Sequence, residues 1–422
     1  MQFFRQCAWQ VLVVVFVILN FIFVDAGQAR ESLYWPMYLP AFTGKHSSQG
    51  SGPLVIKDST WPKYFFVSGT KAYTLFKQEG IDAHSYSYGH RVYKSWVPSE
   101  VTAWKEAQRR SRNEDDFIIV INYGVWMGGR KSYVTDLQNV GLMDNYLGGI
   151  KQTFQLLATA KGRVLVNFPP DPLAYFAGDI RKNYNNDARN VPSRINETRI
   201  VRDEGFGEIP ANFAGFWQVI DRLRCRYAPN VMLAYTLKTW GIGVDPGHPP
   251  HGDAWQKSDQ EIRNKVAYLQ SYGVDWDALA FNYNPGAVHH DKAMARRIAT
   301  YYAAIAKGLG VSRRTGSQVR PFIWKTKICP EQYLNDDPNQ WRYGADLYFE
   351  MTNIRYLASL GYAGINLGYG NELIGSGKSW PSQWKGRPLI LPPILKCWLK
   401  EYFSGQPGNC PVEATIGRVP LQ

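Results

Sequence analysis

The sequence predicts a single (β/α)8 TIM-type barrel with long loops. From about residue 115 onward, short apolar runs rich in β-branched and aromatic residues alternate with helical patterns, which is typical of βα units around a parallel sheet. No glycine-rich phosphate loop follows an early strand, and the loops after the strands are long and irregular. These features favour a closed barrel over an open doubly wound sheet.

Eight strands and at least six helices are expected, in alternating order. The expected strands are 33–39, 64–67, FIIVINY at 117–123, RVLVNF at 163–168, VMLAYTL at 231–237, ALAFNY at 278–283, PFIWKT at 321–326 and AGINLGY at 363–369. The expected helices lie near 99–112, 143–160, 212–227, 258–272, 289–309 and 341–360. The strand runs are short and the helical patterns longer, as expected for βα units.

The N-terminal segment 1–29 has the pattern of a secretion signal. Arg5 precedes an uncharged run, and the small residues Ala26 and Ala29 end it as candidate processing sites. The alternative is an uncleaved anchor, because the uncharged stretch approaches the roughly 20 residues that span a bilayer. We therefore expect a secreted or periplasmic protein that contacts a membrane only if this segment is retained.

The barrel is expected to occupy 30–405, followed by an irregular C-terminal tail at 406–422. Cys397 and Cys410 bracket a short loop rich in glycine and proline, which predicts a local disulfide in an oxidising compartment. The net charge of +13 is spread along the chain. The densest cluster, 109–112, lies on an expected exposed helix, so we expect no nucleic-acid partner.

Aromatic and polar residues gather at the ends of the expected strands, where parallel barrels place their reactive groups. Flat rings with polar tips suit a sugar, whose C–H groups pack on the ring while its hydroxyls form hydrogen bonds. About half of such rings would serve the core instead. The candidate substrate-binding residues are Tyr123, Trp126, Tyr235, Trp240, Asn282, Tyr283, Trp324, Lys325 and Glu372.

Carboxylates also follow the strands, and glycoside hydrolysis commonly uses two of them. Asp171 is the first candidate for general acid or nucleophile, because the prolines around it fix its backbone. A turn or a helix cap is its structural alternative. Glu331 and Asp245 are the candidate partners. Lys325 at a strand end would suit an acidic sugar, and a structural ion pair is its alternative.

The histidines offer a competing hypothesis. His248 and His251 lie near Asp245, and His289 and His290 follow in the next loop. Imidazole and carboxylate groups together can bind zinc, as in a metal-assisted hydrolase. Their spacing matches no compact site pattern, so the main prediction includes no metal and no cofactor.

Two segments, VLVNFPPDPLAYF and DRLRCRYAPNVMLAYTLKTWGIGVD, resemble a family of secreted, largely uncharacterised glycoside-hydrolase-like barrel proteins. In that family the first segment ends in His-x-Glu-Pro-Asp, and the second carries Arg-Tyr-Ala-Pro-Asn before a strand that ends near Trp-Gly. The resemblance runs from about Trp61 to Glu372. It implies a barrel that acts on carbohydrate.

The chain departs from the family pattern at the motif positions. Pro169 stands where the family has the glutamate, whereas Asp171 keeps the aspartate. Asn282 stands where an acidic residue would be natural, and Lys325 replaces a neutral amide.

From the strand-end residues and the resemblance together, we predict a glycoside hydrolase-like protein that acts on a polysaccharide or oligosaccharide. A non-catalytic glycan-binding barrel and a zinc-dependent hydrolase are the alternatives.

Overall fold

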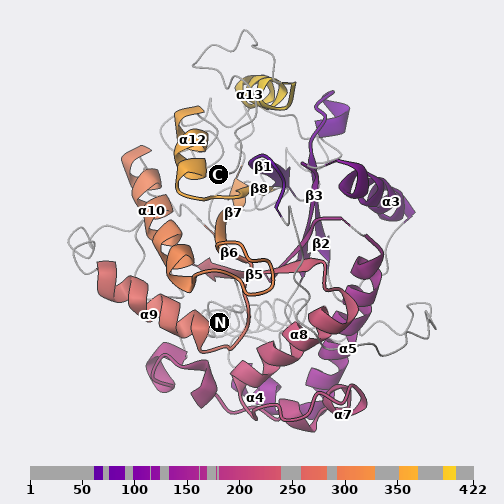
Figure 1. Ribbon diagram of the computed structural model, residues 1–422, viewed down its shortest axis with the longest axis vertical. Coiled ribbons are helices and arrows are strands. Elements are labelled where there is room, and N and C mark those ends of the chain that lie inside the picture. Colours follow the sequence, from indigo (N-terminus) through magenta and orange to yellow (C-terminus); the bar gives the residue numbers. More distant parts are fainter. Residues whose placement is uncertain are drawn as a thin grey trace, which may run out of the picture.

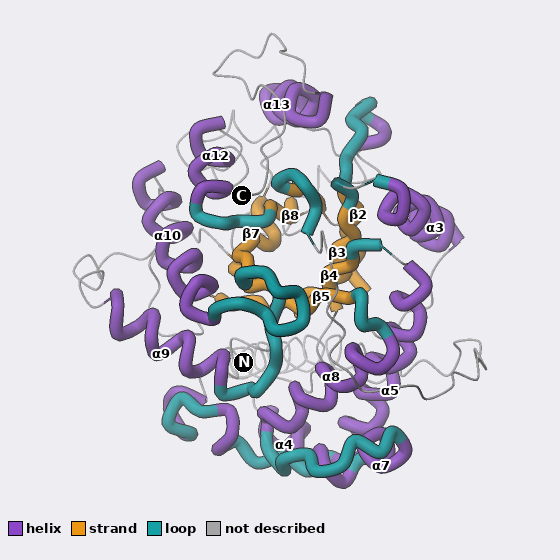
Figure 2. Tube along the Cα trace, viewed as in Figure 1, coloured by secondary structure: helices purple, strands orange, loops and turns teal. Residues whose placement is uncertain are grey.

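The computed structural model has eight parallel strands surrounded by helices (Figures 1 and 2). The structure describes residues 61–69, 76–90, 98–114, 116–123, 133–160, 162–168, 177, 180–238, 258–282, 292–327, 351–368 and 393–404. Within these residues, no helix is long and apolar enough to cross a membrane. The signal segment, the tail and Cys410 lie outside them, so those predictions and the Cys397 pairing stay untested.

The strands follow one another around the barrel in the order β1-β8-β7-β6-β5-β4-β3-β2, and every hydrogen-bonded pair is parallel. Their bounds are β1 Phe66–Gly69, β2 Ser85–His90, β3 Ile118–Tyr123, β4 Val164–Phe168, β5 Val231–Lys238, β6 Ala278–Asn282, β7 Arg320–Lys327 and β8 Gly364–Gly368. The predicted (β/α)8 TIM-type barrel is therefore confirmed.

The main helices cover the outside of this barrel, as Figure 2 shows with the strands at the centre. They are α3 Pro98–Asn113, α4 Tyr133–Gln138, α5 Val140–Leu157, α7 Arg199–Asp203, α8 Phe213–Tyr227, α9 Ser258–Gln270, α10 Lys292–Leu309, α12 Met351–Ser359 and α13 Pro393–Ser404. Each of the six predicted helices corresponds to one of these, with ends shifted by several residues in places.

One strand of the sheet was not predicted. The expected strand at 33–39 lies outside the described residues and stays a prediction, whereas β2 is formed by Ser85–His90, which has the sequence SYSYGH. This segment lacks the apolar run by which the other strands were predicted. Its serines take part in closing the barrel.

Side chains close the seam between β1 and β2, which are not paired as a backbone ladder. The Ser85 hydroxyl donates a hydrogen bond to the Val67 carbonyl. The Asn366 amide on β8 donates to Ser68 Oγ at 3.0 Å and to Ser87 Oγ at 2.8 Å. Hydroxyl and amide groups thus link the two edge strands, and one of these bonds pairs a backbone carbonyl of β1, that of Val67.

Two apolar layers hold the fold together. The barrel interior is filled by side chains that include Phe66, Val120, Leu165, Met232 and Phe322, and a larger cluster lies between the strands and the helices. Small residues accommodate the large ones in the interior. A Cβ atom on Gly364 would lie 2.4 Å from the Phe66 ring, so only glycine fits there without a shift of the neighbouring strand.

A buried lysine on α9 gives the fold a testable pH dependence. Lys265 is 3% exposed, and burial lowers its pKa from 10.5 to about 8. The unfolded chain keeps the proton up to its higher pKa, so the unfolded state binds more protons between about pH 8 and 10.5. Folding stability contributed by this group therefore rises with pH across that window.

We expect Lys265→Met to raise the free energy of unfolding at pH 7 by up to about 3 kcal/mol, because the variant buries no charge. The variant should also lose the rise in stability between about pH 8 and 10.5. Urea unfolding at pH 7, 8, 9 and 10 checks both effects. A variant that is less stable than wild type at pH 7, with an unchanged pH profile, would contradict the expectation.

Candidate functional site at the C-terminal end of the barrel

A layer of polar side chains lies inside the barrel at the carboxyl ends of the strands. Going along the inner face of β3, Ile118 and Val120 belong to the apolar interior and Asn122 follows them. On β4, Leu165 is followed by Asn167 in the same way. The interior therefore changes from apolar to polar toward the end at which parallel barrels build their binding sites.

Hydrogen bonds join this polar layer across the barrel. The Asn122 amide donates to Ser87 Oγ at 3.2 Å, and its Oδ1 accepts from Asn167 Nδ2 at 3.1 Å. Thr236 Oγ1 donates to Asn167 Oδ1 at 2.6 Å. We define the polar layer as Ser68, Ser87, Asn122, Asn167, Thr236, Trp324 and Asn366, all of which are buried.

Burying polar groups is favourable only when they are paired, and the hydrogen bonds of the polar layer pair its side chains and fix their positions. One atom of the layer is an exception to this pairing. Asn366 Oδ1 is buried and has no hydrogen-bond partner within the part of the chain that the structure describes. It is an acceptor available to a water molecule or a ligand hydroxyl.

Trp324 belongs to this layer. Its ring is 2% exposed, and its Nε1 donates to Asn122 Oδ1 at 2.6 Å. Trp324 thus lies on the inner side of β7, in the floor beneath the strand ends. Its predicted contact with sugar stays a prediction.

Tyr123 and Tyr235 need a correction, because both rings lie on the helix side of the barrel. Tyr123 packs against Tyr146 and Phe168, with ring centroids 6.1 and 6.0 Å apart. Tyr235 packs against Trp217 of α8 at 5.8 Å. Each is 1% exposed. Side chains alternate along a strand, so the inward positions of Asn122 and Thr236 turn the adjacent tyrosines outward, away from a sugar platform.

The Tyr235 hydroxyl completes a buried phenol cluster. It lies 3.3 Å from the hydroxyl of Tyr268 and 3.1 Å from that of Tyr272. Burial raises the pKa of Tyr235 well above its ordinary value. The phenol is therefore neutral and serves the packing of α8 and α9 against the sheet.

The other predicted site residues divide into two groups. Asn282 is the last residue of β6, and Lys325 lies in β7 near a register irregularity; both are thus near the carboxyl ends of their strands. The following residues lie outside the described part of the chain and stay predictions: Asp171, Glu331, Asp245, Trp126, Trp240, Tyr283 and Glu372. The histidines of the zinc hypothesis, at 248, 251, 289 and 290, also lie outside it.

The polar layer was missed at the sequence level although a signal exists. Three strands carry asparagine next to their last residue or two before it, in the triplets Ile-Asn-Tyr at 121–123, Val-Asn-Phe at 166–168 and Ile-Asn-Leu at 365–367. Asparagine is uncommon within buried strands. Its recurrence at the same end of three strands could have predicted a polar layer.

The fold and this layer define a parallel α/β barrel that has a polar, hydrogen-bonded interior at the carboxyl end of its strands. No family model and no curated protein matches the chain.

Several solved structures are similar in fold. A thermostable mutant of a xylanase from Cellvibrio japonicus is 12% identical, with a TM-score of 0.39 over 74% of this chain and 87% of that chain. A β-1,4-mannanase from the sea hare Aplysia kurodai is 9% identical, with a TM-score of 0.36 over 72% and 88%. Yersinia pestis DHPS is 7% identical, with a TM-score of 0.32 over 75% and 90%. At such values the function of this chain rests on its own residues.

Proposed function

We propose that this protein is a secreted or periplasmic glycoside hydrolase-like barrel that binds a polysaccharide or oligosaccharide at the carboxyl end of its strands. The observation that supports it is the polar layer beneath that end. Amide, hydroxyl and indole groups that are fixed by mutual hydrogen bonds form a preorganised floor for a polar ligand. Ser68, Ser87 and Asn366 also close the barrel seam, whereas Asn122, Asn167, Thr236 and Trp324 place further polar groups in an interior that apolar side chains fill elsewhere.

In the proposed reaction, Asp171 acts as general acid or as nucleophile, and Glu331 or Asp245 supplies the second carboxylate. One carboxyl group protonates the leaving glycosidic oxygen, while the other attacks the anomeric carbon or activates a water. Trp240 provides an apolar face for the sugar ring, and Trp324 supports the floor beneath it. The cation of Lys325 favours an acidic glycan.

A glycan-binding barrel without turnover is the second candidate. It is favoured by one sequence observation, the proline at position 169 where the resembling family has a glutamate. Such a protein would keep the floor and the aromatic platform but lack one of the two carboxyl groups that hydrolysis needs.

The test measures oligosaccharide release from neutral and acidic polysaccharides by the purified chain, with Asp171→Asn and Glu331→Gln beside it. We expect release by the wild type and at least a hundredfold slower release by Asp171→Asn, because general acid–base catalysis contributes about 10²–10⁴-fold. Binding to the same glycans without release would contradict the hydrolase and support the glycan-binding barrel without turnover. Release that a chelator abolishes while the chain stays folded by circular dichroism would favour the zinc hydrolase.

A further inference from the structure

Three side chains converge at the end of the barrel opposite to the proposed binding site. His84 directly precedes β2, and Glu114 and Asp116 lie just before β3. His84 Nδ1 lies 3.2 Å from Asp116 Oδ1 and 3.4 Å from Glu114 Oε2. All three donor atoms lie within 4.8 Å of one another, and all three residues are half-buried. They share no sequence motif, since about 30 residues of chain separate the histidine from the carboxylates.

The spacing of these donor atoms suits a small transition-metal ion. Zinc bonds to imidazole nitrogen and carboxylate oxygen measure about 2.0–2.2 Å, so the ligand atoms of a tetrahedral site lie about 3.3–3.6 Å apart. The two distances from His84 Nδ1 are 3.2 and 3.4 Å. An imidazole nitrogen with two carboxylate oxygens favours zinc-like ions over magnesium or calcium, which prefer oxygen alone.

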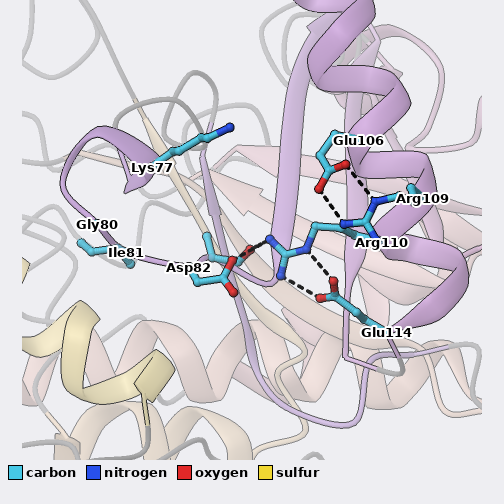
Figure 3. A pocket seen from close by; sticks show the side chains of 9 residues that line it. Lys77, Gly80, Ile81, Asp82, Glu106, Arg109, Arg110 and Glu114 are labelled. Carbon is cyan, nitrogen blue, oxygen red and sulfur yellow. Dashed lines mark hydrogen bonds and ion pairs between the residues drawn. The ribbon is translucent and has the colours of Figure 1, made fainter.

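Neighbouring groups orient this set. Arg110 donates to both oxygens of Glu114 at 2.7 Å and to Asp82 Oδ1 at 2.8 Å, and Figure 3 shows its guanidinium between the two carboxylates. The ring of Phe403 on α13 stacks on His84, with centroids 5.8 Å apart. Supporting hydrogen bonds of this kind fix the ligands of metal sites. Each carboxylate oxygen bonded to Arg110 keeps a second lone pair for an ion.

We propose that His84, Glu114 and Asp116 bind one divalent transition-metal ion of the zinc type. The ion links the start of β2 to the connection between α3 and β3. Three protein ligands leave a fourth position for water. Its place at the N-terminal end of the barrel, away from the mouth, gives it a stabilising role. The inference is independent of the proposed function.

The test counts zinc equivalents bound by the metal-stripped full chain in competition with a chromogenic chelator. The variants are His84→Ala, Asp116→Asn and the control Asp82→Asn, which leaves the three ligands in place. We expect wild type and Asp82→Asn to bind one equivalent more than His84→Ala. Asp116→Asn should bind that equivalent at least tenfold more weakly. Zinc should raise the midpoint of thermal unfolding only where the equivalent is present.

Cobalt(II) as a second metal probe and His251→Ala as a second histidine variant show whether the bound ion lies at His84 or elsewhere in the chain. Cobalt(II) bound by the wild type should give a visible spectrum of a low-coordinate nitrogen and oxygen site, which His84→Ala loses. If His84→Ala fails to fold, Asp116→Asn and Glu114→Gln carry the test. Equal stoichiometry and affinity in wild type and Asp116→Asn would overturn the proposal and leave an ion-paired cluster. Loss of the zinc equivalent in His251→Ala, but not in the His84 or Asp116 variants, would also overturn it.

Discussion

Replacing Asp277 by asparagine is expected to lower the free energy of unfolding by about 3–5 kcal/mol. Asp277 is fully buried just before β6, with its Oδ2 3.0 Å from Arg224 Nη1 and 2.6 Å from Arg314 Nη2. The side chain of Arg224 is 1% exposed and that of Arg314 is 9% exposed. The substitution leaves Arg314 without its counterion and leaves Arg224 with Asp221 alone. Uncompensated charge in the interior is among the most destabilising changes known for single substitutions.

The carboxylate of Asp277 also joins three chain segments by hydrogen bonds. It accepts from the Leu233 backbone N–H at 2.8 Å and from the Ser312 hydroxyl at 2.9 Å. Asparagine keeps the shape and can accept only one of these bonds through its oxygen. The loss therefore combines an ionic and a hydrogen-bonding contribution.

The midpoint of urea unfolding, with the slope of the transition, measures this loss. The control is Asp187→Asn, whose partner Arg189 is exposed. Exposed pairs contribute about 0–1 kcal/mol, so the control should unfold close to wild type. If both variants lose the same stability, Asp277 does not hold a buried charge cluster.

Sequence patterns predicted the barrel because six strands and six helices carry strong apolar periodicity. They failed at β2, where SYSYGH has no apolar run. The serines of β2 are explained only by the assembled barrel, in which Ser85 and Ser87 bond to β1 and β8. A strand whose polar side chains face a polar interior looks like a loop in the sequence.

The sequence also could not predict in which direction the side chains at the strand ends point. In a parallel barrel the strands are buried on both faces, so Ile118 to Ile121 are all apolar. Their sequence therefore does not indicate which of the alternating side chains face the barrel interior. Tyr123 and Tyr235 were therefore assigned to the mouth, although the structure turns both toward the helices. Contacts such as Arg224 with Asp277 have no local signal either, because 53 residues separate the partners.

Replacing Asn122 by leucine is the second change expected to have a large effect. Asn122 Oδ1 accepts hydrogen bonds from Asn167 Nδ2 and Trp324 Nε1. Leucine leaves both buried donors without this acceptor, at a cost of about 1–3 kcal/mol for each unsatisfied group. We expect a total loss of about 2–6 kcal/mol in the free energy of unfolding, together with weaker glycan binding if the proposed function is right.

A double-mutant cycle separates this hydrogen-bond effect from a general effect of leucine. Trp324→Phe removes one of the two donors, so Asn122→Leu should cost less in the Trp324→Phe background than in the wild type, with a coupling of about 0.5–3 kcal/mol. Asn183→Leu, at an exposed position, serves as the surface control and should change stability by less than about 0.5 kcal/mol. Strict additivity of the two core substitutions would show that the indole and the amide do not act together. The polar layer would then be a set of separate contacts and could not serve as a preorganised floor.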